Sequence, residues 1–177
     1  MAGKRAFDVD TDERWMRMAL DLAGRAEALG EVPVGALVVA AGEIAGHGFN
    51  HMIAGSDPTA HAEIGAIRNA SRKLANYRLT GATLYCTVEP CIMCLGAALH
   101  ARIGRLVYGA ADPKVGAVAE LDRMRAAGAL FNHRLDCLGG VLGTESSELL
   151  RGFFERRRGT ESGRNHAFGD GEVPKWS

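Results

Sequence analysis

The chain has 177 residues, of which 47% are hydrophobic and 24% charged, as in an ordinary globular protein. This length favours one domain. The 21 basic and 21 acidic residues cancel, so any nucleic acid must be bound by a local basic patch rather than by the net charge of the protein. No apolar run approaches the roughly 20 residues that span a bilayer, and the N-terminal segment lacks the apolar centre of a secretion signal. We therefore expect a cytoplasmic protein that does not bind membranes.

The first part of the chain is predicted to form a helix followed by a β-hairpin. Apolar residues recur at steps of three and four over residues 12–29, with Asp10 as a possible N-cap and Gly30 at the end of the helix. The apolar segments 32–40 and 44–49 flank a short glycine-containing turn and are predicted to pair as antiparallel strands.

The remainder of the chain alternates helices and strands. The predicted helices cover residues 60–74, 90–101, 117–127 and 145–158, and the predicted strands cover residues 82–88, 105–110 and 134–138. A strand, helix, strand order implies parallel pairing through a right-handed crossover. We expect one α/β domain over residues 11–158, with flexible ends at residues 1–10 and 159–177.

Three residues have the chemistry and spacing of metal ligands. Cys91 and Cys94 are three positions apart at a predicted helix start, where they share a face and the helix dipole favours thiolates. His61 also lies at a helix start, and imidazole with two thiolates is a normal ligand set for zinc. Three protein ligands leave a fourth position for water, as in catalytic zinc sites. Glu63 can reach this water without binding the metal, and is the predicted general acid and base.

A Cys-x-x-Cys pair alone is equally typical of a structural metal site. In such a closed site Cys86 would supply the fourth ligand, but strand alternation places this thiol in the core instead. Cys137 is also predicted to pack in the core. The combination of His-Ala-Glu with a downstream Pro-Cys-x-x-Cys favours one catalytic zinc ion per chain.

Several segments together resemble the bacterial tRNA adenosine deaminases, a branch of the cytidine deaminase superfamily. The matching segments are 32–36, 48–50, 57–63, 76–79, 83–85, 89–94, 102–105 and 132–134, and the likeness extends from about Trp15 to Arg158. The resemblance implies a three-layer α/β/α cytidine-deaminase-like fold with a five-stranded mixed sheet. It also implies a zinc-dependent hydrolase that converts adenosine to inosine at the wobble position of a tRNA anticodon, and a homodimer that packs through helices of the Cys91 region.

The resemblance further implies contacts with the tRNA anticodon stem-loop. Asn50 is implied to hydrogen-bond the target nucleoside, and Asp112 to meet the nucleic-acid backbone beside the flipped base; either can instead cap a turn. Arg156, Arg157 and Arg158 are predicted to bind phosphates near the end of the last helix, although basic residues there also suit the helix dipole.

Two other functions remain open at this point. Residues 57–63 and 93–97 also resemble free guanine deaminases, which perform the same chemistry on a smaller substrate, whereas residues 109–117 resemble the tRNA-acting family. The third possibility is a noncatalytic, zinc-stabilised RNA-binding domain, but a closed structural site has no need for Glu63. Residues 118–131 depart from the family pattern and leave the loop contacts of this segment open.

Overall fold

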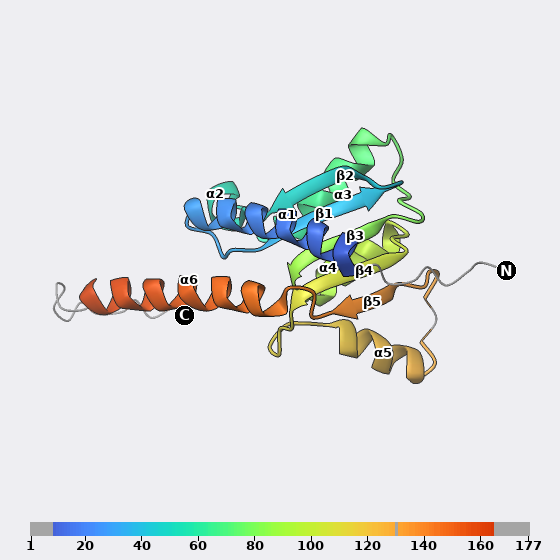
Figure 1. The fold of residues 1–177 in the computed structure, drawn as a ribbon. Helices are drawn as coiled ribbons and strands as arrows, with labels where there is room; N and C mark the ends of the chain where they lie inside the picture. Colours follow the sequence, from blue (N-terminus) through green and yellow to red (C-terminus); the bar gives the residue numbers. More distant parts are fainter. Residues whose placement is uncertain (1–8, 130, 165–177) are drawn as a thin grey trace, which may run out of the picture.

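A computed structural model describes residues 9–129 and 131–164 of the chain, and this part contains six helices and five strands (Figure 1). In chain order they are α1 (Val9–Ala28), β1 (Gly35–Ala40), β2 (Glu43–Phe49), α2 (Met52–Gly55), α3 (Ala62–Lys73), β3 (Thr83–Val88), α4 (Ile92–His100), β4 (Arg105–Ala110), α5 (Val118–Ala126), β5 (Asp136–Gly139) and α6 (Gly143–Arg164). The strands form one sheet in the order β2-β1-β3-β4-β5. β1 is antiparallel to β2 and β3, whereas β3, β4 and β5 are parallel, which confirms the predicted mixed sheet.

Helices cover both faces of this sheet because its central strands are apolar on both sides. In β1, Ala36 and Val38 pack into the core that includes residues of α3 and α4, whereas Leu37 and Val39 pack against α1. The first core also contains Leu121 of α5. The result is the predicted three-layer α/β/α arrangement, in which α6 begins beside β4 and extends past the sheet (Figure 1).

Helix α3 lies unusually close to β2, because two glycines of this strand leave room for its backbone. A Cβ atom at Gly48 would lie 2.3 Å from the carbonyl oxygen of Ala62, and one at Gly46 would lie 2.3 Å from that of Ala66. These distances are far below ordinary van der Waals contact, so only glycine fits at both positions. The packing fixes the start of α3, where His61 and Glu63 are located.

A buried polar cluster connects α1 with the sheet. Asp12 is 2% exposed and accepts hydrogen bonds from the Tyr85 hydroxyl at 2.8 Å and from two nitrogens of Arg105 at 2.7 and 2.6 Å. Burial of Asp12 opposes its charged form, but the hydrogen bonds from Arg105 and Tyr85 outweigh this effect, so the pKa of the carboxyl lies below its ordinary value. The ionised form of Asp12 therefore stabilises the fold.

Most predicted elements shift by a few residues at their ends, and three differences change the interpretation. α1 begins at Val9, so Asp10 lies within its first turn and is not the N-cap. The four-residue α2 was not predicted, because it buries no side chain and so shows no apolar pattern. α6 continues to Arg164, beyond the predicted domain end at residue 158.

The flexible ends remain predictions, since residues 1–8 and 165–177 lie outside the described part of the chain. None of the described helices has the length and apolar character needed to cross a membrane.

Candidate active site

The three predicted metal ligands meet where α3 and α4 begin. His61 is the N-cap residue of α3, Cys91 is the N-cap residue of α4, and neither side chain caps its own helix. The Nδ1 atom of His61 lies 3.8 Å from Sγ of Cys91 and 3.6 Å from Sγ of Cys94. All three donor atoms lie within 4.8 Å of one another. The sequence-predicted set is thus assembled from two segments 30 residues apart.

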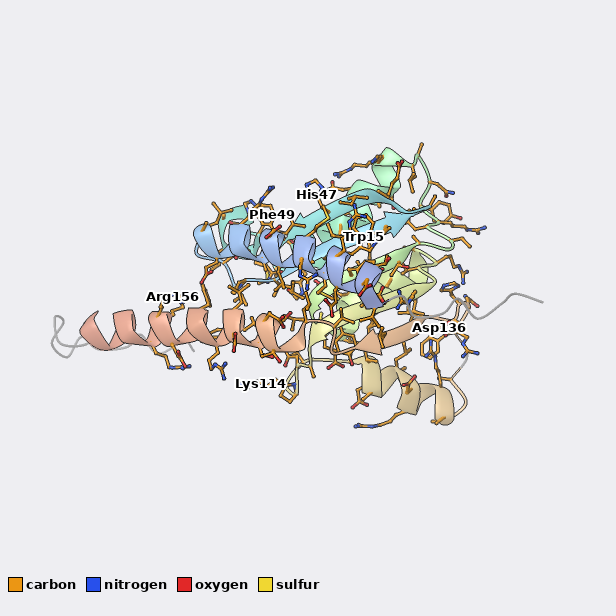
Figure 2. All side chains as sticks on the ribbon, viewed as in Figure 1. Trp15, His47, Phe49, Lys114, Asp136 and Arg156 are labelled. Carbon is orange, nitrogen blue, oxygen red and sulfur yellow. The ribbon has the colours of Figure 1, made fainter. Side chains whose placement is uncertain are left out.

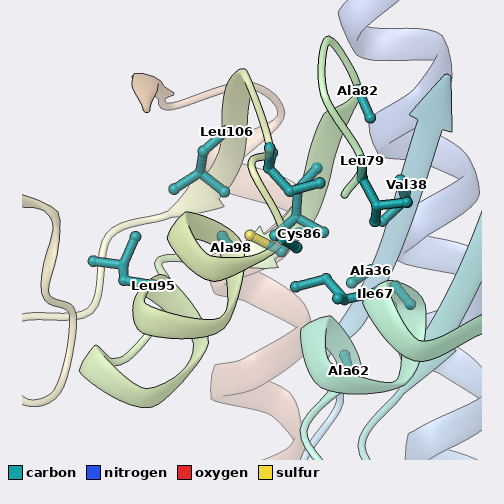
Figure 3. Packing of buried hydrophobic residues seen from close by; sticks show 14 of the residues in the cluster. Ala36, Val38, Ala62, Ile67, Leu79, Ala82, Cys86, Leu95, Ala98 and Leu106 are labelled. Atoms are coloured by element: carbon teal, nitrogen blue, oxygen red, sulfur yellow. The ribbon is translucent and has the colours of Figure 1, made fainter. Parts of the chain in front are cut away.

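These distances fit a zinc ion. Tetrahedral zinc, with Zn–N near 2.1 Å and Zn–S near 2.3 Å, places its nitrogen and sulfur ligands about 3.6 Å apart. The observed nitrogen–sulfur distances lie at or slightly above this value. Within the described residues, Cys86 does not join the ligand group; it is fully buried in the core (Figure 3). Its thiol donates to the Val107 carbonyl instead. The closed four-ligand alternative is therefore wrong.

Glu63 lies in the first turn of α3 and is only 4% exposed. Burial raises the pKa of its carboxyl above the ordinary value, although the neighbouring His61 and a hydrogen bond with Cys94 act in the opposite direction. The carboxyl group is thus held beside the metal ligands without belonging to the ligand group.

Two expectations for the cysteines are corrected. Burial and the Glu63 carboxylate raise the pKa of Cys94 in the metal-free protein rather than lowering it, so the metal must displace the thiol proton. Cys137 is exposed rather than packed in the core, because β5 is the edge strand of the sheet and most of its residues face solvent. Both errors arise from surroundings that the local pattern does not reveal.

Asn50 and Asp112 both make local hydrogen bonds. Oδ1 of Asn50 accepts a hydrogen bond of 3.0 Å from the backbone N–H of Ala62, the residue directly after the ligand His61. The Nδ2 donor of Asn50 has no partner among the described residues. Oδ1 of Asp112 accepts the N–H groups of Lys114 and Val115 at 2.9 and 3.2 Å, which closes a turn in the loop after β4. Asn50 therefore keeps a free donor near the metal centre, whereas Asp112 shapes its own loop.

Two carboxylates that sequence reasoning missed hold helix α2 and the loop after β4. Glu31 is fully buried, and its Oε1 accepts the backbone N–H groups of Ile53 and Ala54, both at 2.8 Å. Its Oε2 is buried without a partner in the described part of the chain. Glu89 accepts the N–H of Asp112 at 3.2 Å and that of Val118 at 3.0 Å. The only sequence signal was the position of Glu89, directly before the Pro-Cys-x-x-Cys segment.

The three arginines of α6 do not join the metal centre. Arg156 forms an ion pair with Glu27 of α1, and Figure 2 shows its side chain between the two helices. Arg157 and Arg158 are exposed on the part of α6 that extends beyond the sheet. The sequence correctly predicted a helix with exposed basic residues, but not the ion pair.

Comparison with known proteins identifies the family. Residues 9–110 match the cytidine and deoxycytidylate deaminase zinc-binding region. The tRNA-specific adenosine deaminase of Haemophilus influenzae is 53% identical over 152 residues, which cover 83% of this chain and 85% of the relative. The chain belongs to the tRNA-specific adenosine deaminase family. Its metal is zinc, one ion per chain, held by the donor set described above.

Two solved structures support the fold of this deaminase family member. One, from a study of A-to-I editing by tRNA deaminases at the wobble position of transfer RNA, has a TM-score of 0.72 and 41% identity, and the match covers 77% of this chain and 99% of that one. The other, a mutant protein in complex with 8-azaguanine, has a TM-score of 0.68 and 26% identity, with 80% and 83% coverage. Related domains thus occur with a tRNA-editing activity and with a bound purine base.

Proposed function

We propose that the protein deaminates adenosine to inosine at the wobble position of a tRNA anticodon. The observation that carries this proposal is the buried Glu63 carboxyl beside the three-ligand zinc site formed by His61, Cys91 and Cys94. A structural site has no need for a buried proton carrier there. Membership of the tRNA-specific adenosine deaminase family supports the choice of substrate.

Each residue of the site has a separate role in this reaction. When bound, zinc lowers the pKa of a coordinated water to about 7, so that a nucleophile is available at neutral pH. Glu63 accepts a proton from the water that attacks C6 of adenine and delivers it to the leaving amino group. The C6–N bond breaks, the second proton of the water moves to N1 as C6 becomes a carbonyl, and ammonia leaves. The free Nδ2 donor of Asn50 is positioned to orient the nucleoside.

The RNA backbone is expected to lie against the loop after β4 and against α6. Asp112 acts through the turn that it closes, while Arg157 and Arg158 are exposed for phosphate contacts. Arg156 has to exchange its Glu27 partner for a phosphate, so it contributes less than its charge suggests. An RNA substrate of this kind is present in the cytoplasm, so we propose that the protein acts there.

We also propose a homodimer that packs through the start of α4. Ile92 is 62% exposed beside the ligand Cys91, and Val115 is 60% exposed in the loop that pairs with Cys91 through Gly116. Leu95, by contrast, is buried within the chain and does not contribute. Light scattering at micromolar concentration should give a dimer, and Ile92→Arg should weaken it; a monomeric wild-type protein would contradict this proposal.

One assay separates the candidate functions. Purified protein is incubated with an anticodon stem-loop that carries adenosine at the wobble position, with free adenosine and with guanine, and inosine and ammonia are measured. We expect conversion of the stem-loop, slow turnover of free adenosine, and a loss of about 10² to 10⁴ in rate for Glu63→Gln with zinc retained.

The second candidate, a free guanine deaminase, is favoured by the relative solved with 8-azaguanine. It predicts rapid turnover of guanine and an untouched stem-loop. The noncatalytic alternative predicts no ammonia from any substrate and no difference between the wild type and Glu63→Gln.

A further inference from the structure

An open hollow of about 460 Å³ lies between the end of β4 and the first turns of α6. Its walls are glycine and alanine residues around the end of β4 and the start of α6, and its polar side chains are Thr144, Ser147 and Arg151. Because these three residues are spaced by three and four positions, they share one face of the helix. None of the roles assigned above uses this hollow.

Arg151 gives the hollow its chemical character. The side chain is exposed, and it forms no ion pair with any described residue, although Glu148 and Glu155 lie one turn away on the same helix. Thr144 also has a hydroxyl without a partner in the described chain, whereas the Ser147 hydroxyl donates to the Gly143 carbonyl at 2.7 Å. A free guanidinium and a free hydroxyl beside walls without bulky side chains suit a phosphate group.

The hollow adjoins the metal centre through β4. Ala110, in its wall, pairs with Val88, and its carbonyl accepts the N–H of Glu89 at 2.8 Å. Cys91 follows two residues later, so the wall and this ligand are separated by a distance on the order of 10 Å. Figure 2 shows the loop after β4, labelled at Lys114, near the first turns of α6.

Neighbouring carboxylates do not prevent anion binding at this place. Asp112 uses Oδ1 for the N–H groups of Lys114 and Val115, and Glu89 uses both oxygens for the N–H groups of Asp112 and Val118. Their negative charge is thus partly compensated by backbone donors, whereas Arg151 forms no ion pair with Glu148, Glu155 or any other described residue.

We propose that this hollow binds one phosphodiester group of the RNA substrate next to the target adenosine, with Arg151 as its main ligand. The proposal rests on the proposed function and adds a phosphate site to it. Arg151 holds the backbone while the base enters the zinc pocket, so this contact contributes to affinity and register rather than to sequence recognition.

The test compares binding of the anticodon stem-loop by the wild type, Arg151→Ala, Arg151→Lys and the control Arg123→Ala over a series of salt concentrations. Arg123 is exposed on α5 and pairs with Glu120, so its replacement removes the same charge away from the hollow. We expect Arg151→Ala to weaken binding by about 10-fold or more and to lower the salt slope by about 0.7. Arg151→Lys should keep the slope, and Arg123→Ala should change neither quantity.

A second measurement identifies the phosphate. Two stem-loops are prepared, one with an uncharged methylphosphonate before the wobble adenosine and one with it after this adenosine. The affinity of the wild type and of Arg151→Ala is measured for each. One of these substitutions should weaken binding to the wild type and have no further effect on Arg151→Ala. Equal losses for both proteins, or an unchanged salt slope in Arg151→Ala, would overturn the inference. If the wild type binds the stem-loop but leaves its adenosine intact, the proposed function fails independently.

Discussion

A methyl group on β2 should disturb the zinc site through the backbone of α3. In Gly48→Ala, the new Cβ would lie 2.3 Å from the Ala62 carbonyl oxygen and 2.7 Å from the Ala66 nitrogen. Ordinary contact begins near 3.4 Å, so the start of α3 has to move by about 1 Å. Ala62 lies between His61 and Glu63, and metal ligand distances tolerate only about 0.2 Å. We therefore expect a loss of zinc affinity, a roughly 10²-fold loss of activity and about 1–3 kcal/mol of lost stability.

Three measurements check this expectation: zinc per chain after dialysis, inosine formation on the stem-loop, and the midpoint of thermal unfolding. Gly24→Ala is the matched control, because a Cβ at this position of α1 meets nothing within 4 Å. It should leave zinc and activity unchanged and stabilise the protein by up to about 1 kcal/mol. If Gly48→Ala keeps its zinc, its turnover and its unfolding midpoint, then close packing of α3 on β2 does not determine the geometry of the site.

Three other outcomes follow from the contacts of named groups. Because the pKa of Asp12 is lowered in the folded protein, the stability that its ionised form contributes is complete above the unfolded pKa of 3.8 and is lost as the pH falls through the folded pKa. Asp12→Asn should therefore lower the free energy of unfolding in urea by about 2–3 kcal/mol at pH 7 and by less below pH 4. Glu89→Ala should retain zinc but speed amide hydrogen exchange over residues 112–118, and unchanged exchange would show that Glu89 does not hold this loop. A chelator should lower the unfolding midpoint of the wild type, zinc should restore it, and Cys94→Ser should respond to neither.

The sequence predicted those features that depend on local periodicity and on ligand chemistry. The apolar spacing of α1 and the strand alternation around Cys86 predicted individual helices and strands, whereas the three layers and the five-stranded sheet were implied by the family resemblance. The metal site was predictable because His61, Cys91 and Cys94 each lie at the start of a helix. The family resemblance, rather than spacing, supplied the substrate.

Contacts between distant segments could not be predicted. Glu31 and Glu89 act on backbone N–H groups that lie 22 to 29 positions further along the chain, and a backbone donor leaves no mark in a sequence. The ion pair of Arg156 with Glu27 joins residues 129 positions apart. Cys137 was misplaced because sheet order, not strand pattern, makes β5 an edge.

The metal ligands and the surrounding loops are held by different means, and this difference bears on how one zinc site can serve several substrates. The ligands are fixed by helix starts, one of which is packed backbone against backbone on β2. Buried or partly buried carboxylates instead hold the neighbouring segments: Glu31 binds backbone N–H groups of helix α2, and Glu89 binds those of Asp112 and Val118 in the loop after β4. The loop after β4 also pairs with the ligand Cys91 through Gly116, so it connects the chain around the pocket to the metal centre. Related domains occur with tRNA editing and with 8-azaguanine, and we expect substrate choice to depend on such segments rather than on the metal motif.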